Sequence, residues 1–230
     1  LPGMLHGKIL RSPHAHAVIK SIDAAKALAL PGVKAVVTSA DLPVLSGRPV
    51  DVAEGSPLNP RFLSNNVLAA DKALYKGHAV AAVAADSVHT AEAALSLIEV
   101  GYEVLTPVLD GKEAMEPDSP ILHDRLFRSE GEFFRPGGLR DDDDDSVPTN
   151  IASHFIFELG DPDQGFKDAE VVVEREFHTK PVHQGYIEPH SATVRWDRNG
   201  RVTVWGSSQG HFAIRDFTAL VLGIPISRVK

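Results

Sequence analysis

The stretch Ser-Ser-Gln-Gly at residues 207–210 is the strongest local indication of chemistry in the sequence, because it lies between a predicted β-hairpin and a predicted helix. The first N–H groups of a helix have no partner within it, and its N-terminus carries a partial positive charge. Ser207 or Ser208 can cap the helix, and Gly210 would let a ligand approach the backbone closely. The stretch therefore predicts an anion-binding site from which the Gln209 side chain projects, or equally a capped helix without a ligand.

His14 and His16 have the spacing of metal ligands, because residues two positions apart lie on the same face of an extended strand. No nearby carboxylate or third histidine completes a set of ligands. Motifs this short often match by chance, so we interpret both residues as structural or interface histidines and keep a metal site as the alternative.

The segment HQGYIEPH at residues 183–190 gathers polar side chains at the expected mouth of a strand. His183 and Glu188 could support general acid–base catalysis. Glu188 could instead be a buried carboxylate that accepts hydrogen bonds from backbone N–H groups around Pro189. We favour the structural role, because a histidine and a carboxylate without a nucleophile define no reaction.

The composition excludes several classes of function. There are no cysteines, so this chain cannot form disulfides or hold zinc or an iron–sulfur cluster through cysteine. The formal net charge of −8 argues against binding to nucleic acid or to an anionic membrane. No apolar run reaches the roughly 20 residues that span a bilayer, and a cytoplasmic location follows by default. GxGxxG, GxSxG, HExxH and a P-loop are absent, so nothing supports a dinucleotide fold, a serine hydrolase, a zincin or an NTPase.

Two segments of regular structure must position the candidate residues. The first, residues 1–110, alternates strands and helices and predicts an α/β or α+β domain in which helices cover one sheet. Its first strand breaks near Pro13 and resumes through Ala17–Ile22, and Asp23 caps a helix that Pro31-Gly32 ends. A later helix carries four apolar residues on one face: Ala91, Ala94, Leu95 and Ile98.

Residues 111–149 interrupt this alternation and include five consecutive aspartates at 141–145. Such a block of like charges repels itself and stays solvated. We therefore expect a flexible acidic connector and not a metal site, because the carboxylates of a metal site normally converge from separate positions.

Residues 150–230 are expected to form the beginning of a second domain. They predict a strand in IASHFIFELGD, a short helix in PDQGFKDA and a long strand over residues 169–179, AEVVVEREFHT. A hairpin with an Asn199-Gly200 turn follows, because period-2 alternation flanks a dipeptide suited to positive φ. The last predicted helix, which begins near His211, is stopped by Gly223 and Pro225.

The order of these pieces resembles the molybdenum hydroxylases of the xanthine dehydrogenase and aldehyde oxidase family. Residues 1–43, from LPGMLHGKILRSPHAHAV to VVTSADLP, are similar to the opening of that family's large subunit. Residues 75–110, from YKGHAVAAVAAD to YEVLTPVLD, are similar to a family segment that usually has Leu-Pro where Thr106-Pro107 stands here. Residues 160–216, from GDPDQGF to SSQGHFAIRD, match the family pattern nearly throughout. The resemblance covers almost the whole chain except the acidic connector.

This resemblance implies an α/β domain of the hammerhead type over residues 1–110, followed by the beginning of a molybdopterin-binding α+β domain. It puts Gln209 beside the molybdenum, where its amide would donate a hydrogen bond to an oxygen on the metal without binding the metal itself. Gly210 and Phe212 would line the pterin. Glu188 and His190 would support that loop structurally.

The resemblance also implies a reaction and partners. Family members hydroxylate an aldehyde or an aromatic heterocycle with oxygen from water, and electrons leave through molybdenum to iron–sulfur clusters and FAD. Because this chain has no cysteines, we expect those carriers on separate FAD-binding and 2Fe-2S subunits. The molybdopterin could carry a cytosine dinucleotide, as it often does in bacterial relatives.

The family's GGxFGG loop, its substrate-binding arginine and its catalytic glutamate follow beyond residue 230. We therefore expect no catalytic residue in this chain and no activity of this chain alone. It would be a fragment, a truncated product or one piece of a split large subunit. The alternative is a non-catalytic interaction or assembly module that keeps the family scaffold without the cofactor.

Overall fold

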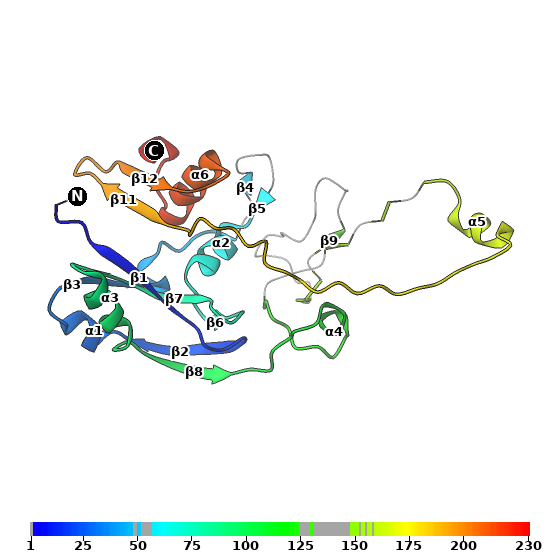
Figure 1. The fold of residues 1–230 in the computed structure, drawn as a ribbon, viewed down its shortest axis with the longest axis horizontal. Helices are drawn as coiled ribbons and strands as arrows, with labels where there is room; N and C mark the ends of the chain where they lie inside the picture. Colours follow the sequence, from blue (N-terminus) through cyan, green and yellow to red (C-terminus); the bar gives the residue numbers. More distant parts are fainter. Residues whose placement is uncertain are drawn as a thin grey trace.

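The computed structural model describes residues 2–47, 50–51, 57–124, 129–130, 148–151, 153–154, 156–157 and 159–230. Figure 1 shows the first elements gathered in one body, with the last hairpin and helix beside it and α5 at the end of a long extension. The elements of the first part are β1 (His6–Arg11), β2 (Ala17–Asp23), α1 (Ala25–Ala29), β3 (Val33–Thr38), η1 (Ser39–Asp41), β4 (Val50–Asp51), β5 (Pro57–Leu58), α2 (Pro60–Val67), β6 (Lys72–Ala73), β7 (Ala79–Ala85), α3 (Val88–Leu95) and β8 (Glu99–Val104). The remaining elements are α4 (Gly111–Met115), β9 (Ser129–Glu130), β10 (Ser153–His154), α5 (Pro162–Asp168), β11 (Ala192–Trp196), β12 (Val202–Gly206), α6 (His211–Leu222) and η3 (Ile226–Arg228).

The predicted strand break near Pro13 is confirmed, and it divides the strand between two sheets. β1 belongs to a three-stranded antiparallel sheet with the order β1-β7-β3. β2 belongs to a second antiparallel sheet with the order β6-β2-β8. The short segment between β1 and β2 therefore links the two sheets of the first domain.

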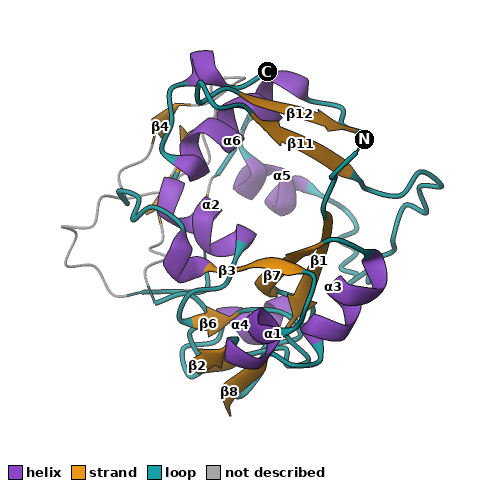
Figure 2. Cartoon of the chain, turned by 90° about the vertical axis from the view of Figure 1, so that its left-hand side faces the viewer, coloured by secondary structure: helices purple, strands orange, loops and turns teal. Residues whose placement is uncertain are grey.

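The main core lies between the sheet β1-β7-β3 and the helices α1 and α3, which Figure 2 shows together beside that sheet. Small side chains let the layers approach closely, because Ala81, Ala85, Ala91 and Ala94 are all 0% exposed. The predicted apolar face of the helix contributes to this core, although Ile98 follows the end of α3 at Leu95.

The predicted ends of α1 agree with the structure to within one residue. The carboxylate of Asp23 accepts the N–H of Ala25 at 2.9 Å, one residue earlier than the assigned cap, Ala24. The helix ends before Gly32, whose φ of 96° belongs to the left-handed region.

The predicted hairpin and last helix are confirmed. β11 and β12 pair antiparallel from Ala192 opposite Gly206 to Trp196 opposite Val202. Gly200 has a φ of 79° in the turn, and Gly223, with a φ of 63°, ends α6. A smaller core forms where α6 packs on β12, around Val202, Ala219 and Val229.

The predicted long strand over residues 169–179 is wrong in the structure of this chain. The short helix α5 forms as expected, with the Asp161 side chain capping it and Pro162 in its first turn. Residues 169–191, however, pair with no described strand and are exposed throughout. A strand needs a neighbour to bond its N–H and C=O groups, and the described part of this chain supplies none here.

Two other predictions are tested only in part. Of the strand predicted in residues 151–161, only β10 is paired among the described residues, in parallel with β9. The five aspartates at 141–145 lie outside the described residues, although α4 shows regular structure at the start of the predicted connector. None of the helices in the described ranges is long and apolar enough to cross a membrane.

Candidate functional site

The hairpin brings the two candidate loops of the second domain to the same place. Because Ala192 pairs with Gly206, the segment that enters β11 and the segment that leaves β12 lie at the same end of the hairpin. The approach is close, since a Cβ on Gly206 would lie 3.4 Å from the carbonyl oxygen of Ser191. Residues 183–190 and 207–210, far apart in sequence, thus lead into neighbouring positions.

The predicted serine cap of α6 is wrong. The capping position is Gly210, which has no side chain, and α6 has no side-chain cap bond. Ser208 lies too early in the chain, so its hydroxyl accepts the N–H of Gly210 itself at 3.0 Å. The first internal bond of α6 runs from the N–H of Ile214 to the carbonyl of Gly210 at 3.0 Å. Within the described ranges no side chain caps the first N–H groups of α6, so they can bind an anionic group.

Gln209, Gly210 and Phe212 lie at the start of α6, next to these N–H groups in the chain. Gln209 is exposed, and Phe212 is 58% exposed although it is a large apolar side chain. The guanidinium of Arg215 lies 5.3 Å from the Phe212 ring centre, and its Nε donates to the carboxylate of Asp216 at 2.9 Å. The start of α6 thus offers N–H donors, a neutral amide and an exposed ring.

Glycine at position 210 is not required by the fold of this chain. Its φ of −126° is open to any residue. A Cβ there would make an ordinary contact, 3.5 Å from the Cβ of Ala213. Because Gly210 has no side chain, an anionic group could approach its backbone closely.

The loop 183–190 does not have the buried carboxylate that we expected. Glu188 is exposed and forms no hydrogen bond or ion pair with any described residue. Aromatic contacts join the side chains of this loop: the ring of Tyr186 contacts those of His183 and His190, each with 4.7 Å between ring centres. The prediction failed because no described residue covers the loop, so nothing buries Glu188.

His16 has a structural role. It is 3% exposed, and its Nδ1 lies 2.9 Å from the carbonyl oxygen of Thr106, which ties the start of β2 to the residues after β8. The ring of His14 packs edge-on against Tyr102, 5.0 Å between centres. Within the described ranges, no three His, Asp or Glu residues are grouped to hold a metal ion, so the metal alternative has no third ligand.

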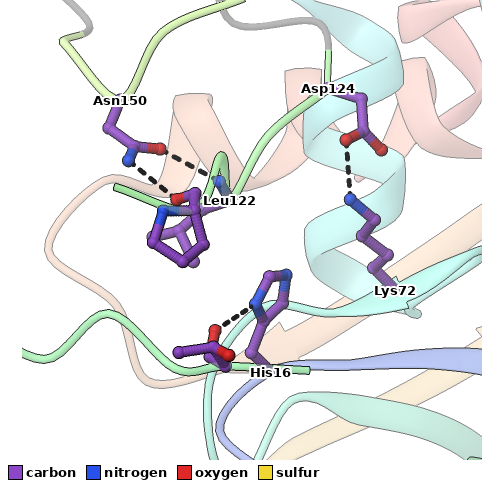
Figure 3. A network of polar contacts seen from close by, with 7 residues as sticks. His16, Lys72, Leu122, Asp124 and Asn150 are labelled. Carbon is purple, nitrogen blue, oxygen red and sulfur yellow. Dashed lines mark hydrogen bonds and ion pairs between the residues drawn. The ribbon is translucent and has the colours of Figure 1, made fainter. Parts of the chain in front are cut away.

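A cleft that the sequence did not indicate lies beside α2. Its volume is about 430 Å³, and its walls are α2 and the segments 42–45, 70–74 and 122–124. Figure 3 shows the polar contacts near it, including the Lys72–Asp124 ion pair at 2.6 Å. His123, against the ring of Phe62, also lines the cleft, and burial lowers its pKa below the ordinary value. No motif marks these residues, because they meet only through the tertiary fold.

Two known families of domain match the chain. Residues 1–106 match the a/b hammerhead domain of aldehyde oxidase and xanthine dehydrogenase. Residues 144–230 match the molybdopterin cofactor-binding domain. The chain belongs to the molybdenum hydroxylase family. The described part of this molybdenum hydroxylase chain is accordingly an α+β hammerhead domain followed by the start of a cofactor-binding domain.

The relatives of this molybdenum hydroxylase chain include proteins named for different substrates. It is 36% identical over 240 residues to the carbon monoxide dehydrogenase large chain of Afipia carboxidovorans, covering 100% of this chain and 27% of that protein. It is 35% identical over 241 residues to the probable hypoxanthine oxidase XdhD of Escherichia coli (strain K12), covering 96% of this chain and 24% of that protein. The chain thus spans about a quarter of the length of these relatives.

A solved structure supports the same membership of the molybdenum hydroxylases. Reconstituted CO dehydrogenase from Oligotropha carboxidovorans matches with a TM-score of 0.74 and 35% sequence identity. The match covers 100% of this chain and 27% of that one.

Proposed function

We propose that this chain is the N-terminal portion of the large subunit of a molybdopterin-dependent hydroxylase, and that the start of α6 helps to hold the cofactor. The observation that carries the proposal is the uncapped N-terminus of α6, with Gln209, Gly210 and Phe212 around it, inside the region that matches the molybdopterin cofactor-binding domain. The cofactor supplies the oxidation chemistry when it is bound.

The residues present fit an anionic group that contains oxygen. The amide of Gln209 can donate a hydrogen bond without adding charge, and a hydrogen bond to a charged partner contributes roughly 1.5–3 kcal/mol. The free N–H groups at the start of α6 and the partial positive charge there favour the same kind of group. Phe212 would give an apolar wall to a planar ring system. None of these residues exchanges a proton, so their part is to bind and orient.

The finer features follow from the same proposal. The complete enzyme would oxidise an aldehyde or an aromatic heterocycle with oxygen from water, and its cofactor could be the cytosine dinucleotide form. Its partners would be the rest of the large subunit and FAD-binding and 2Fe-2S subunits in the cytoplasm. The residues divide, in this proposal, into 1–110, a connector at 111–149 and 150–230, and this portion alone would be inactive. The comparisons do not favour the alternative of a module without cofactor.

Replacing Gln209 in the complete large subunit tests the proposal. Gln209→Ala should lower kcat/KM by about 10- to 100-fold, because the loss of one hydrogen bond to a charged group corresponds to about 1.5–3 kcal/mol. Molybdenum content and native mass should stay close to wild type. Gln209→Glu should be worse than Gln209→Ala, because a carboxylate would repel an anionic group.

Gln164 supplies the matched control. It is an exposed glutamine on α5 whose amide bonds Asp168 at 2.8 Å, on the extension and not at the start of α6. Gln164→Ala should leave turnover unchanged. Wild-type turnover of Gln209→Ala would remove the role proposed for Gln209.

A further inference from the structure

Residues 169–184, named here the arm, form a long exposed apolar segment that no described residue covers. Figure 1 shows the arm returning from α5 toward the hairpin as an extended run. Phe177 and Val182 are each 87% exposed, and Val171 is 77% exposed. Exposed apolar side chains in a contiguous patch mark an interaction site.

The arm has the alternation of a strand with one apolar face. In an extended chain successive side chains point to opposite sides, so Val171, Val173 and Phe177 share one face, with Arg175 among them. The other face carries Val172 and Val182 together with five charged or titratable residues: Glu170, Glu174, Glu176, His178 and Lys180. The arm therefore reads as a strand that packs one face on a core and leaves the other in water.

The contacts of Glu176 orient these two faces. Its carboxylate forms an ion pair with Lys112 of α4, and His178 lies 3.3 Å from the same carboxylate. The charged face thus lies toward α4. The apolar face, with Val173 and Phe177, consequently points away from α4.

We propose that the arm is one strand of a sheet whose next strand comes from the part of the large subunit outside this chain. The proposal rests on the proposed function, in which the chain is part of a larger subunit. The relatives support this source, because the chain covers only 27% of the carbon monoxide dehydrogenase large chain. Unpaired N–H and C=O groups give the arm its affinity for a strand, and the apolar face selects a partner with apolar side chains on the matching side.

A second copy of this chain is a poorer partner for the arm than a strand from the rest of the large subunit. Two arms paired antiparallel about Arg175 would put Glu174 of each copy opposite Glu176 of the other. Like charges directly opposite in a sheet are destabilising. A strand from elsewhere in the subunit avoids this repulsion.

Amide hydrogen exchange on the complete large subunit tests the proposal. Peptides covering residues 171–177 should exchange at least about 100-fold slower than the same segment in an unfolded control, as paired strands do. Peptides from β7, which pairs on both sides, give the reference for a protected strand in the same sample. Exchange of residues 171–177 at the rate of the unfolded control would overturn the proposal.

Two neighbouring valines give a matched pair of variants. Val173→Asp puts a charge on the apolar face, and Val172→Asp puts the same charge on the opposite face at a residue that is 57% exposed. Val173→Asp should lose most of the exchange protection of the arm and Val172→Asp should keep it. Equal loss in both variants would overturn the assignment of faces.

The outcome can be separated from that of the proposed function. Exchange protection needs neither bound cofactor nor turnover, so it can be measured in subunit purified without molybdenum. A protected arm in a subunit that never binds molybdenum would support the sheet and refute the cofactor site. An unprotected arm in a subunit with a full complement of molybdenum would refute the sheet and support the cofactor site.

Discussion

His78 is the largest fully buried side chain of the described residues, at 1% exposure, and it links three parts of the hammerhead domain. Its Nδ1 accepts the N–H of Leu74 at 3.2 Å, and its Nε2 donates to the carbonyl oxygen of Asn65 at 2.8 Å. The ring stacks on Tyr75 with 4.4 Å between centres. Both ring nitrogens are thus used by a neutral imidazole.

Replacing His78 with phenylalanine keeps a ring against Tyr75 and removes both hydrogen bonds. The N–H of Leu74 and the carbonyl of Asn65 then lose their partner, which costs about 1–3 kcal/mol for each buried group. Both bonds are only part-buried, so we take the lower part of that range for each. We expect His78→Phe to lower the free energy of unfolding by about 2–3 kcal/mol.

Urea denaturation of the purified chain at neutral pH, followed by circular dichroism, measures this loss. His89, an exposed histidine on α3, is the matched control, and His89→Phe should change the free energy of unfolding by less than about 0.5 kcal/mol. A loss for His78→Phe as small as that of the control would refute the assignment of the two hydrogen bonds to stability.

Three further predictions concern the same domain. Burial lowers the pKa of His78, so below the ordinary histidine pKa of about 6.5 the unfolded state binds more protons and stability should fall as the pH falls toward the folded-state pKa. Urea denaturation at a series of pH values should therefore give a flatter profile for His78→Phe than for wild type, and equal slopes would contradict this. Gly32→Ala should cost about 1–3 kcal/mol, because φ is 96° and a Cβ would lie 2.6 Å from the Asp86 carboxylate. Gly3→Ala, also at positive φ but with nothing within 4 Å, should cost less, and equal thermal midpoints would show that the Asp86 contact is unimportant. Ser87→Ala should lower stability by about 1 kcal/mol, because it removes the cap on the Thr90 N–H. Ser96→Ala, at the exposed other end of α3, should leave stability unchanged. Equal thermal midpoints for the two variants would argue against the cap.

Local signals in the sequence predicted most of the elements. The hairpin could be predicted because alternating side chains flank Asn199-Gly200, and Gly200 adopts the positive φ that the turn needs. The break near Pro13 could be predicted because proline has no N–H to donate to a sheet. That the two halves of this strand enter different sheets could not be predicted, because the pairing partners β7 and β8 lie far along the chain.

The errors arose where the outcome depends on something beyond the local sequence. The alternation in residues 169–179 is that of a strand, but pairing requires a neighbour that the described chain does not supply. The burial of Glu188 depends on what covers its loop. The wrong prediction of a serine cap concerned only the position of the helix start. The hydroxyl of Ser208 accepts the nearby N–H of Gly210 and does not reach an N–H of α6.

The residue types and their position before a helix predicted the candidate site, but the sequence did not predict what surrounds it. Ser-Gln-Gly before a helix indicated an anion site, and the structure added that α6 has no side-chain cap. Nothing in the sequence indicated the cleft beside α2. Its residues come from four separate segments, and no spacing in the sequence connects them.

Molybdenum content of the complete large subunit, measured by elemental mass spectrometry, tests the cofactor site most directly. Gly210→Leu would put a bulky side chain beside the first N–H groups of α6, and Gly165→Leu puts the same side chain on exposed α5, where nothing lies within 4 Å of a Cβ. We expect wild type and Gly165→Leu to contain molybdenum, and Gly210→Leu to lose most of it while keeping its thermal midpoint. Equal molybdenum in both variants, or none in wild type, would contradict a cofactor held at the start of α6.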